Sequence, residues 1–298
     1  MKKKLAPIVL FVYNRPIHTL KTLEALTNNT LANESTLYII ADGPMQNASD
    51  ENILAIKKTR EIIRKEKWCK EVIIEEKESN KGLAPSVIEG VTNIVNKHEK
   101  IIVLEDDLIT SIHFLEFMNE GLYKYEKKAN IYSINSHMFP IEAKESKSVL
   151  LPMTTTWGWA TWKEKWKCFE VNTDINTPIF TNPHLQNRFN LPSYDYTQML
   201  LKAKHSWGIH WYYSVFKRNG LGVFPTQSLV SNIGFDGSGV NCGTELTSSF
   251  IHQGKIKVLI EDTIDIYFYS LYLNYFDKKS KSKALSTRII RRILNKLK

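Results

Sequence analysis

The sequence predicts an α/β fold with a mostly parallel central sheet. Short apolar runs rich in β-branched residues, typical of strands covered on both faces, alternate with segments whose apolar residues recur every three or four positions, as on one face of a helix. Because helical crossovers join parallel strands, this alternation favours a sheet built from βαβ units. The predicted strands are residues 7–13, 36–41, 71–76 and 101–104, and the helices that follow them are residues 19–27, 51–67, 84–96 and 111–127.

Turn sequences mark the ends of the first three strands. NRP follows the first strand at residues 14–16, DGP follows the second at residues 42–44, and NKG follows the third at residues 80–82. Proline cannot continue the hydrogen bonding of a central strand, and glycine adopts turn conformations that other residues avoid. These turns therefore give the strands sharp boundaries.

The second half of the chain has a less regular pattern. An aromatic-rich stretch, TWGWATW, occupies residues 156–162, and residues 231–243 carry four glycines in thirteen positions. The glycine-rich segment is predicted to be a mobile loop. The remaining predicted elements are strands at residues 131–136 and 222–225 and helices at residues 195–204, 211–219 and 262–276.

The net charge of +9 is concentrated at the C-terminus. Residues 278–298 contain nine Lys or Arg residues and no acid, which leaves 31 basic residues to balance the 31 acidic residues of the rest. A formally neutral body argues against a nucleic-acid-binding surface spread over it. We therefore divide the chain into a body at residues 1–277, with halves at residues 1–130 and 131–277, and a basic tail at residues 278–298.

The basic tail has the pattern of an amphipathic helix. Leu285, Ile289, Ile293 and Leu297 recur every fourth residue, and arginines and lysines occupy the opposite arc. Such a helix is expected to lie on an anionic lipid surface as a peripheral membrane contact. The alternative is a solvated, charged end of the chain. The sequence has no run of about 18 apolar residues that would predict a membrane span.

The three cysteines indicate a reducing compartment. Cys69, Cys168 and Cys242 are widely spaced, form no CxxC pattern and cannot all pair with one another. Disulfide frameworks of secreted proteins use even numbers of cysteines at closer spacing. We therefore expect the protein in the cytoplasm.

Three carboxylates, Glu105, Asp106 and Asp107, follow the fourth predicted strand directly. Three acids at the end of a buried strand cannot all stay ionised without a counter-charge. A divalent metal ion that carries a diphosphate would supply that charge. The alternative is an acidic, solvated loop.

Polar residues also follow the other strands of the first half. Asn14 and Arg15 follow the first strand, Asp42 the second, and Lys81 and Gly82 the third. In a parallel sheet these strand ends meet at one edge, where ligands of α/β proteins bind. A cation, a carboxylate and a glycine at that edge predict a nucleotide-diphosphate pocket. Each residue taken alone could equally be an ordinary polar turn residue.

The sequence lacks the motifs that are typical of several other classes of enzyme. The chain has no GxxxxGK[ST] sequence and no GxGxxG after its first strand, which argues against P-loop kinases and dinucleotide-dependent dehydrogenases. It also has no HExxH, paired-cysteine or nucleophile-elbow motif.

The first half of the chain resembles a known family. The segments PIVLFVYNRP, ADGP, NKGLAPSV with the following EGV, and IIVLEDDL are similar to GT-A glycosyltransferases, in particular bacterial sugar transferases related to the Golgi N-acetylglucosaminyltransferase that starts hybrid N-glycans. The resemblance covers residues 5–243 and is most specific over the first 130. It implies a Rossmann-like nucleotide-diphospho-sugar transferase fold, with residues 1–130 binding the nucleotide sugar and residues 131–277 the acceptor.

The family's EDD triplet corresponds to Glu105, Asp106 and Asp107. The resemblance implies that Asp107 binds Mn²⁺ or Mg²⁺ and that Glu105 and Asp106 contact the donor sugar and the ribose. The sequence SNIGFDGSGVNCG resembles a loop that closes over the diphosphate, in which the family often carries a histidine at the position of Asn241.

Two further segments resemble the family's acceptor side. TWGWATW is similar to a Gly-Trp segment near the acceptor, so Trp157 and Trp159 are candidate acceptor-binding residues, with core packing as the alternative. LPSYDYTQML is similar to the helix start that supplies the catalytic base, which makes Asp195 the candidate base. Asp195 could instead only cap its helix, and Asp236 is the competing candidate base.

Together these features predict a metal-dependent, inverting glycosyltransferase. The expected donor is a UDP-sugar, UDP-N-acetylglucosamine or UDP-galactose first, and the expected acceptor is a glycan or a lipid-linked sugar in bacterial surface-polysaccharide synthesis at the inner face of the membrane. One alternative is a sugar-1-phosphate nucleotidyltransferase. Enzymes of that class carry a glycine-rich phosphate loop near the N-terminus, where this chain has YNRP. The other is a non-catalytic scaffold that binds sugar nucleotides at the membrane.

Overall fold

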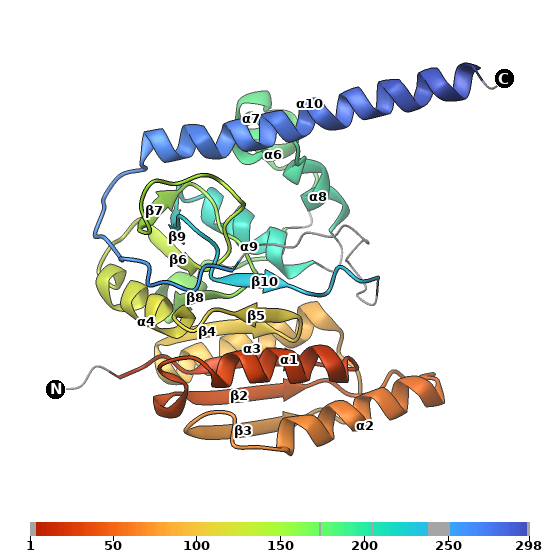
Figure 1. Cartoon of the computed structure of the whole chain (residues 1–298), viewed down its shortest axis with the longest axis vertical. Helices are drawn as coiled ribbons and strands as arrows, with labels where there is room; N and C mark the ends of the chain where they lie inside the picture. The colour runs from red at the N-terminus through yellow and green to blue at the C-terminus, as the bar shows by residue number, and fades with distance from the viewer. Residues whose placement is uncertain (1–3, 173, 204–205, 238–250, 297–298) are drawn as a thin grey trace.

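A mixed central sheet runs through both halves of the chain (Figure 1). The computed structural model describes residues 4–172, 174–203, 206–237 and 251–296, with the side chains of the last helix described as far as residue 281. In spatial order the strands of this sheet are β3 (Glu71–Glu76), β2 (Thr36–Ala41), β1 (Ile8–Val12), β4 (Lys100–Glu105), β8 (Trp159–Trp162), β6 (Ile131–Asn135), β9 (Leu221–Pro225) and β7 (Ser148–Leu151).

The predicted α/β class with a mostly parallel sheet is confirmed. β1 pairs in parallel with β2 and with β4, and β2 pairs in parallel with β3, so the four strands predicted in the first half all end at one edge. β8 runs antiparallel to both β4 and β6, which makes β6 parallel to β4, and β9 is parallel to β6. β7 is antiparallel to β9. The C-terminal end of β6 therefore lies at the same edge as the ends of β1, β2 and β4.

Helices cover both faces of the sheet. The helices are α1 (Pro16–Thr27), α2 (Asp50–Arg64), α3 (Leu83–His98), α4 (Phe114–Tyr125), α5 (Lys163–Trp166), α6 (Pro178–Thr181), α7 (Pro183–Phe189), α8 (Tyr196–Lys202), α9 (Trp207–Phe216) and α10 (Ile266–Lys296), with a 3₁₀ turn, η1 (Ala32–Glu34).

The alternation of side chains along β1 shows how the two layers are filled. Ile8 and Leu10 pack into a core that includes α1 and α4, while Val9 and Phe11 face a second core that includes α3 and α9. All five residues of β1 are buried. This double burial explains why the strand reads as a continuous apolar run rather than as an alternating pattern.

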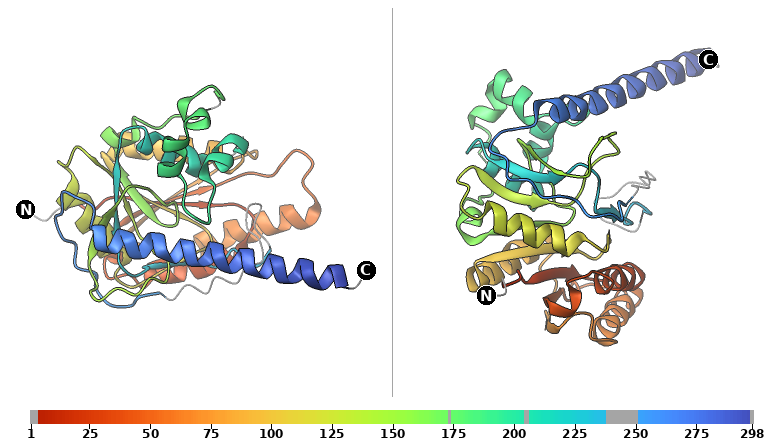
Figure 2. Two further views of the ribbon diagram at one scale, coloured as in Figure 1. Left: turned by 90° about the horizontal axis from the view of Figure 1, so that it is seen from above. Right: turned by 60° about the vertical axis from the view of Figure 1, so that its left-hand side comes forward.

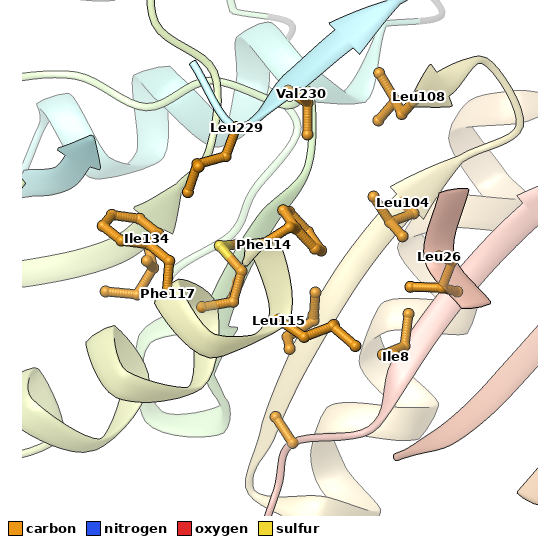
Figure 3. Packing of buried hydrophobic residues seen from close by; sticks show 14 of the residues in the cluster. Ile8, Leu26, Leu104, Leu108, Phe114, Leu115, Phe117, Ile134, Leu229 and Val230 are labelled. Atoms are coloured by element: carbon orange, nitrogen blue, oxygen red, sulfur yellow. The ribbon is translucent and has the colours of Figure 1, made fainter. Parts of the chain in front are cut away.

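A small antiparallel sheet adjoins the central one. It consists of β5 (Leu108–Thr110) and β10 (Val230–Asn232), with Asn232 opposite Leu108. Leu108 and Val230 both reach the core that also holds Leu104 and Phe114 (Figure 3). The carboxylate turn is therefore a tight link between two strands, and the start of the predicted loop at residues 231–243 is strand instead. Residues 238–243 of that loop lie outside the described residues.

Three strands of the second half, β7, β8 and β10, were not predicted from the sequence. β8 lies inside the aromatic stretch, where the density of tryptophan obscured any strand periodicity, and β7 has only four residues. Both are fully buried and pair with strands that lie far away in sequence. Their position was decided by tertiary pairing, which short apolar runs do not reveal.

The predicted helix at residues 262–276 and the predicted tail helix form one continuous helix, α10, of 31 residues. Phe268, Tyr272 and Phe276 lie four residues apart and are buried in a core of the second half. Beyond them the helix extends past the rest of the molecule (Figures 1 and 2). The division at residue 278 thus falls inside a helix. None of the described helices is long and apolar enough to cross a membrane.

Phe276 is predicted to anchor α10 to the body. It is fully buried and contacts the rings of Phe139 and Tyr194 at centroid distances of 4.8 and 5.6 Å. We expect Phe276→Ala to lower the free energy of unfolding by about 3–5 kcal/mol, because it leaves a cavity. The control, Ile266→Ala on the same helix, removes a side chain that is 73% exposed and should change little. Urea denaturation measures both, and equal effects would contradict the anchoring role.

Candidate active site at the carboxyl edge of the sheet

The ends of neighbouring parallel strands bring the predicted site residues of the first half together. Arg15 follows β1 and precedes α1, Asp42 follows β2, and Glu105 is the last residue of β4. Asp106 and Asp107 form the turn into β5. β1 lies between β2 and β4 in the sheet. Arg15 is therefore placed next to the carboxylates, although more than 90 residues separate them in sequence.

Arg15 forms ion pairs with two of the three carboxylates. Its Nε donates to Asp106 Oδ2 at 3.3 Å, and its Nη2 donates to Asp107 Oδ2 at 2.9 Å and also to Asp106 Oδ1. The two aspartate side chains are less than 10% exposed and that of Arg15 is 18% exposed. The guanidinium is thus a built-in counter-charge for the acidic turn.

One arginine does not fully offset the acidic turn. Burial, together with the charges of Asp107 and Asp106, raises the pKa of Glu105 to about 8, against the opposing effect of Arg15. Burial likewise raises the pKa of Asp106 to about 6, although Arg15 acts to lower it. Burial disfavours the charge on Arg15, yet both aspartates hold its pKa above its ordinary value. A further cation at this site would therefore stabilise the ionised forms of these carboxylates.

Asp42 organises the neighbouring loop. Its Oδ1 accepts hydrogen bonds from the backbone N–H groups of Gly43 at 2.9 Å and Lys81 at 3.0 Å, and its Oδ2 accepts from Gly82 N–H at 3.1 Å. Asn80 adds a bond from its Nδ2 to the carbonyl of Gly43 at 3.1 Å. The carboxylate predicted to line the nucleotide-diphosphate pocket thus ties the end of β2 to the loop before α3, a set of contacts that we call the Asp42 clamp.

The other predicted donor-side residues lie around this clamp. Gly82 has a φ of +81°, a backbone conformation that favours glycine, and it precedes α3. The side chain of Lys81 pairs with Glu89 of α3. Asn14 is partly buried between the end of β1 and Arg15.

The segment after β10 covers the acidic turn. Ile233 N–H donates to the carbonyl of Asp107 at 2.9 Å, and Gly234 N–H donates to Asn232 Oδ1 at 2.7 Å. A β-carbon added at Gly234 would overlap Asp107 Oδ2, so this close approach requires glycine. Further along, Asp236 pairs with His18 of α1 at 3.1 Å. We call residues 233–237 the covering segment.

The residues around Gly234 suit a hard divalent cation. Asp107 Oδ2 and Asn232 Oδ1 lie beside this glycine together with the guanidinium of Arg15. Oxygen ligands are what Mg²⁺ and Mn²⁺ prefer. Asn232 was not singled out from the sequence. Within the described ranges, no group of three or more His, Cys, Asp or Glu side chains could hold a metal ion. The arrangement fits a metal that takes one or two protein ligands and completes its shell with substrate phosphates. Asn241 lies outside the described residues.

The two candidate acceptor tryptophans differ in their surroundings. Trp159 has no exposed surface and packs among Trp166, Trp207 and Trp211, with ring centroids 5.4–5.7 Å away. In this structure it is a core residue that no sugar could reach. Trp157 is only partly buried, and its ring lies 5.5 Å from that of Phe235 in the covering segment.

The two candidate bases also occupy different places. Asp195 is exposed and caps α8, where its Oδ1 accepts from Gln198 N–H at 2.9 Å and from Asn190 Nδ2 at 3.3 Å. It lines a surface hollow together with Tyr194 and Ser280. Asp236 belongs to the covering segment beside the acidic turn. The described contacts therefore give Asp195 a capping role and place Asp236 two residues after Gly234, which lies against Asp107.

The chain matches no protein-family model and no curated protein sequence. Among solved structures, it is similar to mouse xyloside xylosyltransferase 1 in its apo form, at 9% identity and a TM-score of 0.38, over 72% of this chain and 82% of that one. It is also similar to TarS of S. aureus, at 8% identity and a TM-score of 0.39, over 77% of this chain and 37% of TarS. A structure of TarS 1–349 gives 9% identity and a TM-score of 0.34, over 57% and 51%. Likenesses this weak establish no shared activity, so function is argued from the site.

Proposed function

We propose that the protein is a GT-A glycosyltransferase that moves a sugar from a nucleotide diphosphate donor to a hydroxyl acceptor. The observation that carries the proposal is the convergence of Arg15, Asp106 and Asp107 at the carboxyl edge of parallel strands. Ligands of α/β sheets bind at that edge. The Asp42 clamp and the covering segment border the same place.

The donor side would use the charges already present. Arginine binds phosphate oxygens with the same planar geometry that it uses for carboxylates. Because a guanidinium has five N–H donors, Arg15 could contact a diphosphate while it stays paired with the aspartates. A Mn²⁺ or Mg²⁺ ion held by Asp107, with Asn232 close by, would neutralise the departing diphosphate as a Lewis acid. Asp106 and Glu105 would contact the ribose and the donor sugar. Of the nucleotide sugars, UDP-N-acetylglucosamine and UDP-galactose are our first candidates.

The transfer itself would invert the anomeric carbon. A bond forms between the acceptor oxygen and that carbon, the bond to the diphosphate breaks, and the diphosphate leaves with the electron pair. A carboxylate on the acceptor side takes the hydroxyl proton, and because the transition state resembles an oxocarbenium ion, a modest base suffices. Asp195 is our candidate for this base, and Asp236 is the competitor.

The far end of α10 supports a peripheral location on a membrane. Nine Lys or Arg residues and no acid lie between residues 278 and 298. The helix that carries most of them extends beyond the body (Figure 2). Such a segment would bind anionic lipid at the inner face of a bacterial membrane. A lipid-linked acceptor for surface polysaccharide would be presented there.

The proposed metal site is tested by Asp107→Ala. Without this carboxylate the diphosphate charge is less well compensated, so we expect Mn²⁺-dependent hydrolysis of nucleotide sugars to fall by about 10² or more and UDP binding to weaken. Asp262→Ala, which removes an exposed acid paired with Lys128, is the control and should retain activity. Full turnover of Asp107→Ala, or undiminished wild-type turnover in excess chelator, would contradict the assignment.

The proposed base is tested by Asp195→Asn. The amide keeps the shape and removes basicity, so we expect kcat for transfer to fall by about 10² or more at unchanged donor KM. Asp236→Asn is the matched comparison, because both residues are exposed aspartates. If only Asp236→Asn lowers kcat, the two roles must be exchanged. Steady-state kinetics with a panel of nucleotide sugars and glycoside acceptors makes the comparison.

The membrane role is tested by deleting residues 278–298. Phe268, Tyr272 and Phe276 remain, so we expect the body to stay folded with little change in unfolding free energy. Binding to vesicles that contain anionic lipid should drop sharply, since each basic residue near such a surface contributes about 1 kcal/mol. Co-sedimentation with anionic and zwitterionic vesicles measures this. Unaltered binding to anionic vesicles would rule out the tail as the contact.

A further inference from the structure

His137 lies two residues beyond the end of β6, a strand whose C-terminal end shares the site's edge of the sheet. Its side chain is buried, with 5% of the residue exposed. Among the described residues, its Nε2 atom has no hydrogen-bond partner. Buried polar atoms are nearly always paired, so an unpaired atom that lies at the site's edge of the sheet is a candidate for contact with a ligand.

The tautomer of His137 follows from its neighbour Ser228. The hydroxyl of Ser228 has one proton, which it donates to the carbonyl of Val230 at 2.8 Å. Because this is the shorter contact, we assign the hydroxyl proton to it, and the Ser228 oxygen then accepts from Met138 N–H at 3.2 Å and from His137 Nδ1 at 3.3 Å. This assignment places the ring proton of His137 on Nδ1. Burial lowers the pKa of His137 to about 3, which keeps the ring neutral. With this assignment, Nε2 carries a lone pair and can accept a hydrogen bond.

Two aromatic rings lie against the imidazole of His137. The imidazole lies 4.4 Å from the ring of Trp157, in a tilted arrangement, and 4.9 Å from the ring of Phe139. A ring face beside a single polar anchor suits a pyranose, because sugar C–H groups pack on the ring while a hydroxyl donates to the anchor. Trp157 is the candidate acceptor residue that keeps some exposed surface.

The covering segment connects this place to the donor side. Phe235 packs on Trp157 at 5.5 Å, while Gly234, the residue before it, lies against Asp107 Oδ2. A diphosphate bound at Asp107 would compete with Gly234 for the same space. Moving the segment away from Asp107 would also draw Phe235 from Trp157, so the two places would be uncovered together.

We propose that His137 Nε2 accepts a hydrogen bond from a hydroxyl of the acceptor sugar, which lies on the ring of Trp157. In the structure Phe235 covers this subsite. The inference rests on the proposed glycosyl transfer for the identity of the ligand as an acceptor. His137 would select the acceptor by the position of one hydroxyl, because a sugar that lacks it would leave Nε2 unpaired.

The test is a direct binding measurement on the full chain labelled with ¹⁵N-histidine. Methyl glycosides of glucose, galactose and N-acetylglucosamine are added with and without UDP and Mn²⁺. We expect at least one of them to shift the Nε2 resonance of His137 in a saturable way, in the direction of an accepted hydrogen bond. No shift with any glycoside, or a resonance already shifted in buffer and indifferent to glycosides, as for a bound water, would overturn the proposal.

Two variants of His137 distinguish the effect of the Nε2 lone pair on glycoside binding from the effect of the shape of the ring. His137→Phe removes the acceptor atom, so affinity for the responsive glycoside should fall about 10-fold or more, while UDP affinity stays unchanged. His137→Gln places an amide oxygen near the position of Nε2 and should restore part of the glycoside affinity. His113→Gln, at a histidine paired with Glu116, is the control and should bind as the wild type does. Equal glycoside affinity of the His137→Phe variant and the wild-type protein would overturn the proposal.

The outcomes distinguish this inference from the proposed function. UDP binding together with an indifferent His137 would overturn the inference and leave the glycosyltransferase proposal standing. A glycoside-dependent shift in a chain that binds no UDP would support the sugar subsite and contradict the donor assignment.

Discussion

The ion pair that Arg15 forms with Asp106 and Asp107 is the constraint on which the site depends. Two carboxylates at the end of a buried strand require a cation, and the sheet order supplies it by placing β1 beside β4. The same guanidinium stands at the start of α1, so the helix, the acidic turn and the strand ends are fixed relative to one another. A ligand that carries phosphate and metal would enter an arrangement whose charges are already partly balanced.

The covering segment links the two sides of this site. Its backbone is hydrogen-bonded to Asp107, Asp236 reaches His18, and Phe235 reaches Trp157. These contacts all depend on β10 pairing with β5, which holds residues 233–237 directly over the acidic turn. A movement of the covering segment away from Asp107 would therefore also change the contact between Phe235 and Trp157, beside His137.

The TWGWATW stretch shows how one motif can serve two purposes. Gly158 has a φ of +65° and no space for a side chain between Ser136 and Phe114. The chain turns there, so Trp157 stays beside the site while Trp159 enters β8 and the tryptophan core. From Trp159 onward side chains alternate between two cores, as in any strand buried on both faces. Glycine at this position thus separates the partly buried Trp157 from the fully buried Trp159.

Local sequence patterns account for the strands and helices of the first half of the chain. Uninterrupted apolar runs and Gly or Pro turns are local signals, so β1 to β4, their helices and the strand-end residues could be predicted from them. Only tertiary structure decided the rest. The partners of β7, β8 and β10, the burial of Trp159, the capping contacts of Asp195 and the unpaired Nε2 of His137 depend on residues distant in sequence. Whether a side chain is buried or hydrogen-bonded depends on the residues that surround it in the folded protein. The periodicity of apolar residues predicts this only for a strand or helix that packs in the same way along its whole length.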